Sequence, residues 1–233
     1  MRQKILLFTA AAAAISAGVF TSARAASFPD PPKSNPPASG TASIVLAGGC
    51  FWGMQGIFEH VKGVTNTVVG YAGGSKETAR YERIEEGDTN HAESVKITWD
   101  PSKISYGELL KIYFSVAHDP TTLNRQHYDQ GTQYRSSIFY TTEEQKTIAE
   151  HYIQELDAAH VFHDPIVTKV VPLPAFYPAE GYHQHYLDQV VACDASPRPQ
   201  CGEMNLGYIH GVDIPLLKAF QSKYPELYIK ESR

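Results

Sequence analysis

A cysteine follows two glycines at the boundary between a strand-like and a helix-like segment. Residues 48–53 have the sequence Gly-Gly-Cys-Phe-Trp-Gly and follow an apolar run at 44–47. Cys50 therefore lies at the predicted start of a helix, where unpaired N–H groups and partial positive charge favour a thiolate over a thiol. Phe51 and Trp52 can line a small apolar pocket beside the sulfur. The alternative is a buried, unreactive cysteine, because free cysteine is among the most buried residue types.

A second group able to do chemistry is Glu93. In residues 92–99 the apolar residues Val95, Ile97 and Trp99 alternate with polar ones, which is typical of a strand with one face in the core. This period places Glu93 on the buried face, where burial raises the pKa of a carboxyl group and keeps it protonated. A neutral carboxyl group is a general acid at working pH. The alternative is a strand-end glutamate that faces solvent or pairs with a basic residue.

Polar side chains gather in residues 129–136, a turn that leads into a predicted strand, and such turns commonly line sites. Tyr134 and Tyr81 can each donate a hydrogen bond into a pocket, and Asp129 can orient a neighbour. The alternative for each tyrosine is simple packing, because the chain contains 14 tyrosines and the residue type alone carries no signal.

The histidines do not have the spacing of a metal site. His160 and His163 are close in sequence, as are His183 and His185, but no thiolate or carboxylate set completes a tetrahedral site at familiar intervals. We therefore expect no metal and interpret these histidines as residues that only make hydrogen bonds. The sequence also lacks a glycine-rich phosphate-binding motif.

The first 25 residues have the pattern of a cleaved signal peptide. Arg2 and Lys4 precede an uncharged run at 5–20, and residues 23–25 are Ala-Arg-Ala, the small-x-small pattern of a cleavage site. A transmembrane anchor is the alternative, but the polar, proline-rich segment that follows favours removal. We expect a periplasmic or secreted protein with no stable membrane anchor.

The rest of the chain is predicted to be one domain with flanking segments. Residues 26–41 are rich in proline and are expected to form a linker that buries no core. We place the catalytic domain at 42–190 and a tail, with an added helix packed on the domain, at 191–233. Loss of residues 1–25 takes the formal charge from −5 to −8, because it removes three basic residues and no acidic one. This balance argues against a nucleic-acid partner.

Strands and helices are predicted to alternate along the domain. Ser105 with Glu108 forms a capping box, and Thr142 with Gln145 caps a second helix. There is no repeated nucleotide-binding unit, so we expect a two-layer α/β sandwich of the α+β class, with a mixed sheet. The expected strands are 43–47, 64–71, 92–99, 137–140 and 166–171, and the expected helices run from Cys50 to about 61, from 105 to about 117, and from 142 to about 156.

The three cysteines of this chain are informative because structural disulfides use cysteines in pairs. Either one thiol is left over, or all three exchange partners. A structural Cys193–Cys201 bridge with an inert Cys50 is the simpler alternative.

Several of these motifs together resemble the peptide-methionine sulfoxide reductase A family. The resemblance runs in order from about Ser43 to Leu187. It implies a ferredoxin-like core, no metal or organic cofactor, and thiol-dependent reduction of the S-epimer of methionine sulfoxide, free or in proteins. The blocks that carry it are 49–53, 87–89 with 91–93, 118–120, 129–136, and 179–180 with 182–184.

The resemblance also implies a role for each candidate residue. Cys193 and Cys201 lie where some members carry recycling cysteines, so the choice between a disulfide relay and a structural bridge stays open. The implied partners are oxidised methionine in proteins and an external, thioredoxin-like dithiol, and we expect a monomer. The site roles are Cys50 as nucleophile, Glu93 as acid, Tyr81 and Tyr134 as holders of the sulfoxide oxygen, Asp129 as their support, and Phe51 and Trp52 as the wall for the substrate methyl group.

Two other functions use the same residues. A cysteine hydrolase or transpeptidase would activate Cys50 through His91 or His183 and would need an oxyanion hole. A non-catalytic binding module would use Phe51 and Trp52 as a methionine pocket, with a structural Cys193–Cys201 bridge.

Overall fold

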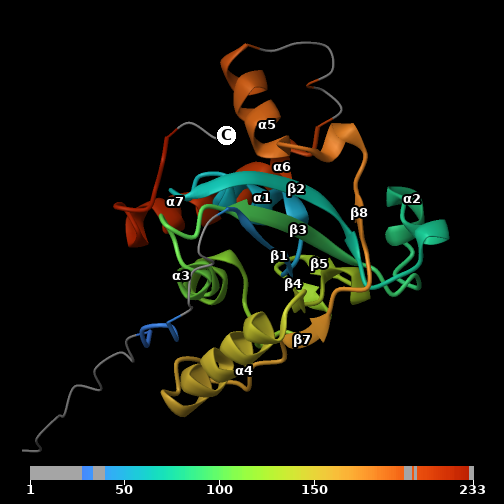
Figure 1. The fold of residues 1–233 in the computed structure, drawn as a ribbon. Coiled ribbons are helices and arrows are strands. Elements are labelled where there is room, and N and C mark those ends of the chain that lie inside the picture. Colours follow the sequence, from blue (N-terminus) through green and yellow to red (C-terminus); the bar gives the residue numbers. More distant parts are fainter. Residues whose placement is uncertain (1–27, 34–39, 197–200, 202–203, 231–233) are drawn as a thin grey trace, which may run out of the picture.

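The computed structural model describes residues 28–33, 40–196, 201 and 204–230. Figure 1 shows a curled sheet with α4 and α5 at opposite ends of the view. The strands are β1 (Ala42–Ala47), β2 (Val64–Ala72), β3 (Ala92–Trp99), β4 (Arg125–Gln126), β5 (Asp129–Gln130), β6 (Ser137–Tyr140), β7 (Lys169–Pro172) and β8 (Phe176–Pro178). The α-helices are α1 (Phe51–Phe58), α2 (Tyr81–Ile84), α3 (Tyr106–Ile112), α4 (Glu143–Ala158), α5 (Tyr186–Ala195), α6 (Leu206–Tyr208) and α7 (Ile214–Lys223).

The main sheet has the order β7-β6-β1-β3-β2-β8. The pairs β6–β1, β1–β3, β3–β2 and β2–β8 are antiparallel, and β6–β7 is parallel, so the sheet is mixed. The units β1-α1-β2 and β3-α3-β6 interleave to give the central order β6-β1-β3-β2, which is the ferredoxin-like arrangement. The predicted α+β class with a mixed sheet and ferredoxin-like core is confirmed.

The core lies between one face of this sheet and the helices. Residues of β1 and β3, including Ile44, Leu46 and Ile97, join side chains of α1, α3 and α4 in the same buried cluster. The opposite face carries a smaller cluster around Val45 and Phe139. Both faces of β1 are therefore buried, as its continuous apolar run predicts.

Local signals in the sequence set several boundaries. The Ser105 hydroxyl accepts from the Glu108 amide at 3.1 Å, and the Glu108 carboxylate accepts from the Ser105 amide at 2.8 Å, so α3 begins with the predicted capping box. Thr142 accepts from the Gln145 amide at the start of α4. A short helical turn at 113–117 extends α3 to the predicted end. These caps satisfy amides that a helix start leaves unpaired.

Some boundaries differ from the prediction. Helix α1 ends at Phe58, because the chain turns through residues 59–63 into β2. Strand β7 begins at Lys169 instead of 166. The short elements α2, β4, β5 and β8 were not predicted, because elements of two to four residues show no periodicity.

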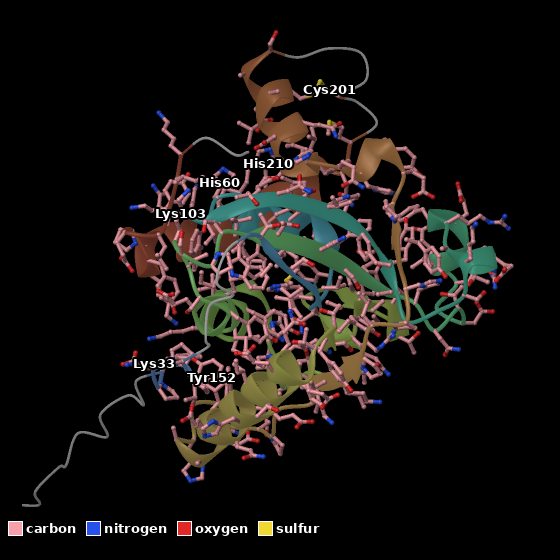
Figure 2. All side chains as sticks on the ribbon, viewed as in Figure 1. Lys33, His60, Lys103, Tyr152, Cys201 and His210 are labelled. Carbon is pink, nitrogen blue, oxygen red and sulfur yellow. A yellow bond between two sulfur atoms is a disulfide. The ribbon has the colours of Figure 1, made fainter. Side chains whose placement is uncertain are left out.

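Part of the predicted linker packs on the domain. Phe28 makes an edge contact with Phe162 at 5.8 Å between ring centroids, and the Tyr152 hydroxyl donates to the Pro29 carbonyl at 3.2 Å. Figure 2 labels Lys33 and Tyr152 at this junction. Residues 28–33 of the predicted linker therefore pack against the domain, with Phe28 partly buried on its core.

The predicted signal peptide at 1–25 lies outside the described residues. Within the described ranges, no helix is both long and apolar enough to cross a membrane.

The tail returns to the domain as predicted. It carries α6, a helical turn at 209–213, and α7, and Phe220 of α7 is fully buried in the main core. The chain then pairs with the loop after α1, where the Ile229 amide donates to the His60 carbonyl at 2.9 Å. The added helix is thus part of the same hydrophobic core.

Candidate active site

The turn between β1 and α1 places Cys50 at the helix start. Cys50 is the residue before the first turn of α1, and its side chain is half-buried. Gly49 has a φ of +98°, and a Cβ there would lie 2.7 Å from the Gln126 side chain. Only glycine fits such a close approach in this conformation. Gly49 therefore allows the turn that places Cys50 at the start of α1, the position that the sequence predicted.

Glu93 faces this helix start from β3. Its side chain is 3% exposed, and its Oε2 accepts from the Phe51 amide at 3.0 Å. Burial raises the pKa of Glu93 to about 8, with Asp129 adding to the rise and the Phe51 amide opposing it. Glu93 is thus a neutral acid at neutral pH, and the alternative of a solvent-facing glutamate is wrong.

A cavity of about 210 Å³ joins these groups. All seven predicted side chains of the catalytic and substrate-binding set line it, so the structure brings together residues up to 84 positions apart in sequence, from Cys50 to Tyr134. Three residues that were not predicted also line it. The lining is Cys50, Phe51, Trp52, Tyr81, Glu85, Glu93, Asp129, Tyr134, Asn205 and Tyr208.

Both predicted tyrosines present protonated hydroxyls to the cavity. Burial raises the pKa of Tyr81 and of Tyr134, and the nearby Glu93 carboxyl raises both further. A phenol that stays protonated can donate a hydrogen bond to an oxygen in the cavity. Tyr81 begins α2 and Tyr134 ends a short turn before β6, so two separate segments hold them.

The resting thiol differs from the sequence-based expectation. Burial raises the pKa of Cys50 well above its ordinary value, and the Glu93 and Asp213 carboxyl groups raise it further. The Trp52 amide acts in the opposite direction. The helix N-terminus is present, but burial among acidic groups outweighs it, so the prediction of a resting thiolate is wrong.

Tyr208 connects the tail to the predicted Asp129. Its hydroxyl donates to Asp129 Oδ2 at 2.5 Å, and burial raises the pKa of both groups. Sequence reasoning missed Tyr208 and Asn205 because neither lies in a motif. No local signal distinguishes Tyr208 from the other tyrosines of the chain.

Glu180 positions one wall of the cavity. Its Oε1 accepts from the Tyr81 amide at 3.0 Å, and its Oε2 accepts from the Tyr71 hydroxyl at 2.8 Å. One carboxylate therefore holds the start of α2 against β2. The residue stands in a motif that carried the family resemblance, but no role was predicted for it.

Aromatic rings form the apolar side of the site. Phe51 is 1% exposed, and Trp52 stacks on Tyr186 with centroids 3.9 Å apart. The Trp52 indole also donates to His183 Nδ1 at 3.2 Å. This packing fixes the indole plane beside the thiol, as expected for a wall that contacts an apolar group.

The three cysteines are not all together. Cys193, on α5, forms a disulfide with Cys201, and Cys50 is free. A permanent structural bridge would have this pairing. A relay in which Cys193 and Cys201 recycle Cys50 would also end with this disulfide. Both alternatives therefore remain open.

The histidines do not activate Cys50. The His91 ring contacts the Gly74 amide at 3.2 Å and the Ser75 carbonyl at 2.8 Å, so both of its nitrogens are engaged. His183 Nδ1 is engaged by Trp52. Among the hydrogen bonds of the described residues, none joins a histidine to Cys50, which disfavours the cysteine hydrolase.

One cluster of potential metal ligands lies away from the cavity. Glu59, His185 and Asp188 place one ligand atom each within 4.8 Å of one another, and none of the three lines the catalytic cavity. Sequence spacing missed this cluster, because Glu59 is 126 positions from His185.

The α+β fold surrounds a thiol with a buried carboxylic acid and two phenols. Such a site defines a cysteine enzyme able to protonate an oxygen while its sulfur attacks. Comparison with known proteins then gives the family. The family model described as peptide methionine sulfoxide reductase matches residues 42–204, and the chain belongs to this family of oxidoreductases.

Relatives and solved structures agree. A peptide methionine sulfoxide reductase MsrA 2 of Mesorhizobium japonicum is 57% identical over 150 residues, which cover 64% of this chain and 77% of the relative. One of Synechocystis is 48% identical over 189 residues, covering 81% and 82%. Mxr1 of Saccharomyces cerevisiae in reduced form has a TM-score of 0.61 at 33% identity, covering 66% of this chain and 88% of that one. Methionine sulfoxide reductase A of Corynebacterium diphtheriae has a TM-score of 0.57 at 37% identity, covering 64% and 75%.

Proposed function

We propose that this protein reduces the S-epimer of methionine sulfoxide in exported proteins, and the free amino acid as well, without a metal or organic cofactor. The observation that carries the proposal is the joint position of Cys50 and Glu93, linked through the Phe51 amide, in a cavity with two phenols. Family membership supports the reaction class.

The proposed chemical step begins with proton donation. A sulfoxide sulfur is a poor electrophile until its oxygen is protonated, so neutral Glu93 gives a proton to the oxygen while the Tyr81 and Tyr134 hydroxyls hold it. The raised pKa of Glu93, about 8, keeps that proton available at neutral pH. Phe51 and Trp52 contact the substrate methyl group.

The Cys50 sulfur then attacks the substrate sulfur and gives up its proton, which restores Glu93. The S–S bond that this attack forms and the substrate S–O bond both break as the protonated oxygen passes to Cys50. Two electrons thereby go from the cysteine sulfur to the substrate sulfur, and methionine leaves. Cys50 becomes a sulfenic acid, the first reversible oxidation state of a thiol. The raised pKa of Cys50 supports this order, because the thiol keeps its proton until substrate arrives.

Recycling is proposed to use the tail. The Cys193 thiol condenses with the sulfenic acid and releases water, and Cys201 then exchanges with the Cys50–Cys193 disulfide. The product is a Cys193–Cys201 disulfide, the pairing found in the structure. An external dithiol protein of the thioredoxin type reduces it by exchange. The alternative is a bridge that never opens.

The proposed location is the periplasm or the outside of the cell, after removal of residues 1–25. A disulfide between Cys193 and Cys201 suits an oxidising compartment. The oxidised methionines of exported proteins would then be the substrates.

The test is a single turnover with the fully reduced protein. It is mixed separately with the S- and R-epimers of an N-acetylated methionine sulfoxide amide, without further reductant, and the N-acetylated methionine amide is measured. The wild type should convert the S-epimer only, and Cys50→Ser should convert neither while keeping its circular dichroism spectrum. An acyl-enzyme on Cys50 would instead support the hydrolase, and binding without conversion would support the binding module.

A further inference from the structure

A buried carboxylate outside the catalytic cavity has an unexplained oxygen. Glu59, just after α1, has a side chain that is 1% exposed. Its Oε2 contacts His185 Nδ1 at 2.8 Å, but its Oε1 is buried without a hydrogen-bond partner. Burying a carboxylate oxygen without a partner costs free energy, so a proton, a hydrogen-bond donor or a cation is expected beside it.

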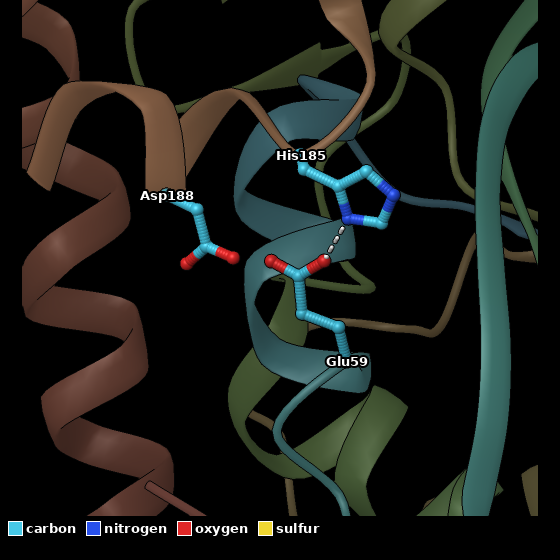
Figure 3. A group of neighbouring side chains, drawn as sticks. All are labelled: Glu59, His185 and Asp188. Carbon is cyan, nitrogen blue, oxygen red and sulfur yellow. Dashed lines mark hydrogen bonds and ion pairs between the residues drawn. The ribbon is translucent and has the colours of Figure 1, made fainter. Parts of the chain in front are cut away.

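The neighbour of that oxygen is another carboxylate. Figure 3 shows the Glu59 carboxyl group between His185 on one side and Asp188, on the first turn of α5, on the other. Among the described residues, no lysine or arginine pairs with Glu59. Two carboxylates in close contact are unfavourable unless a proton or a cation lies between them.

The third ligand is held in place by the backbone. His185 has a φ of +53°, an uncommon left-handed conformation for a residue other than glycine, and its amide donates to Gln55 Oε1 at 2.7 Å. Gln55 in turn donates to the Thr67 hydroxyl at 3.2 Å. The His185 backbone is thus held by contacts from α1 and β2, and its imidazole contacts Glu59.

We propose that Glu59, His185 and Asp188 bind a divalent cation of the zinc type, with water completing the coordination. The cation replaces the proton between His185 Nδ1 and the Glu59 carboxylate. It also gives the unpaired Glu59 Oε1 a partner.

The dimensions and the donor types fit zinc. The three ligand atoms lie within 4.8 Å of one another, and tetrahedral Zn²⁺ with bonds of about 2.1 Å separates its ligand atoms by about 3.4 Å. Small side-chain rotations bridge this difference. One imidazole nitrogen with carboxylate oxygens suits Zn²⁺, whereas Mg²⁺ and Ca²⁺ prefer oxygen ligands only. The ion would join the end of α1 to the start of α5, and α5 also carries Cys193.

The test measures zinc binding in the full chain made without a histidine tag. Cys50→Ser is the parent, with Cys193–Cys201 oxidised, so that no thiolate competes for metal. After chelator treatment and dialysis, titration calorimetry with ZnCl₂ should give one equivalent, and Zn²⁺ but not Mg²⁺ should raise the melting temperature. His185→Ala, Glu59→Gln and Asp188→Asn should each weaken binding about 10²-fold or more and abolish the melting shift.

Matched controls change histidines of other His–carboxylate pairs. His151→Ala, in the pair with Glu155, and His210→Ala, in the pair with Asp194, should bind zinc like the parent. If Glu59→Gln fails to fold, Asp188→Asn still tests the site, because Asp188 is only half-buried. The proposal is wrong if the parent binds no stoichiometric zinc, or if the three variants bind as the parent does. Neither result bears on sulfoxide reduction.

Discussion

Cys50 lies where two electrostatic effects oppose each other. The start of α1 favours a thiolate, but burial and the carboxyl groups of Glu93 and Asp213 favour the thiol, and the second set is stronger. A protonated thiol is a weaker nucleophile than a thiolate. In the proposed mechanism, the thiol becomes reactive as Glu93 gives its proton to a bound sulfoxide.

Glu93 should control the alkaline limit of the chemical step. Because burial raises its pKa from 4.5 to about 8, it stays protonated at neutral pH and ionises as the pH rises through 8. Single-turnover reduction should therefore stay constant up to about pH 7 and fall above pH 8 as the acid loses its proton. Stopped-flow or quenched-flow rates between pH 5 and about 10 give this profile.

Glu93→Gln keeps the shape of the side chain but cannot give a proton, so the neutral rate should fall by about 10²-fold or more and the alkaline limb should vanish. Glu82→Gln, an exposed neighbour of Tyr81, should behave as wild type. An unchanged rate in Glu93→Gln would assign the acid role to another group.

Asp213 should raise the pKa of the thiol. This residue comes from the tail, is 1% exposed and has two carboxyl oxygens without a partner. Burial raises the pKa of Asp213 to about 8, so this group is ionised in the alkaline range where the thiol titrates. Asp213→Asn removes that charge and should lower the pKa of Cys50. Glu93→Gln should lower it more, because Glu93 has the larger effect on the thiol. The pH dependence of iodoacetamide alkylation measures both shifts. Exposed Asp164→Asn is the control, and an alkylation profile identical to wild type in Asp213→Asn would contradict the prediction.

At the scale of elements, local sequence patterns correctly predicted the strands and helices that carry Glu93 and Cys50. Period two along β3 placed Glu93 on the inner face, and the glycines before α1 placed Cys50 at the helix start. Asn205 and Tyr208 could not be predicted, because they reach the cavity through a fold-back of the tail whose path no local pattern specifies. The expectation of a thiolate at Cys50 was wrong for the same reason. It considered the local helix start but not the acidic residues that the fold packs around the thiol.

Helix α5 and the tail should move if the relay operates. Cys193 is 5% exposed and bonded to Cys201, whereas Cys50 lies in the cavity at the start of α1. In the relay, Cys193→Ser should still release one methionine per enzyme but stall in multiple turnover. Cys201→Ser should accumulate a Cys50–Cys193 disulfide, which peptide mapping by mass spectrometry detects.

The structural bridge predicts a different result for the same variants. Both variants should turn over normally with a thioredoxin-type reductant. The free energy of unfolding of each should fall by about 2–4 kcal/mol, because the disulfide no longer restricts the unfolded chain. Denaturant unfolding of the oxidised and reduced wild type measures that contribution separately.

At the scale of the whole molecule, both ends of the described chain pack on the domain. Residues 28–33 contact α3 and α4, where the Lys111 ammonium pairs with Asp30 at 3.0 Å, and the tail joins the core through Phe220. The proline content of the first segment predicted a linker but not its docking, because docking depends on the contact between Phe28 and Phe162.

Cleavage should follow Ala25. Expressed with its leader in a Gram-negative host, the protein should be recovered from the periplasm, and intact-mass and N-terminal analysis should give Ala26 as the first residue, because Ala23 and Ala25 fit a signal peptidase. Ala23→Asp places a charge in the peptidase site and should leave an uncut, membrane-associated form, while Ala26→Ser, just after the cut, should be processed normally. The Cys193–Cys201 disulfide should form only in the exported protein, since the cytoplasm keeps thiols reduced. Recovery of uncut wild-type protein in the cytoplasm, with three free thiols, would refute both the leader and the proposed compartment.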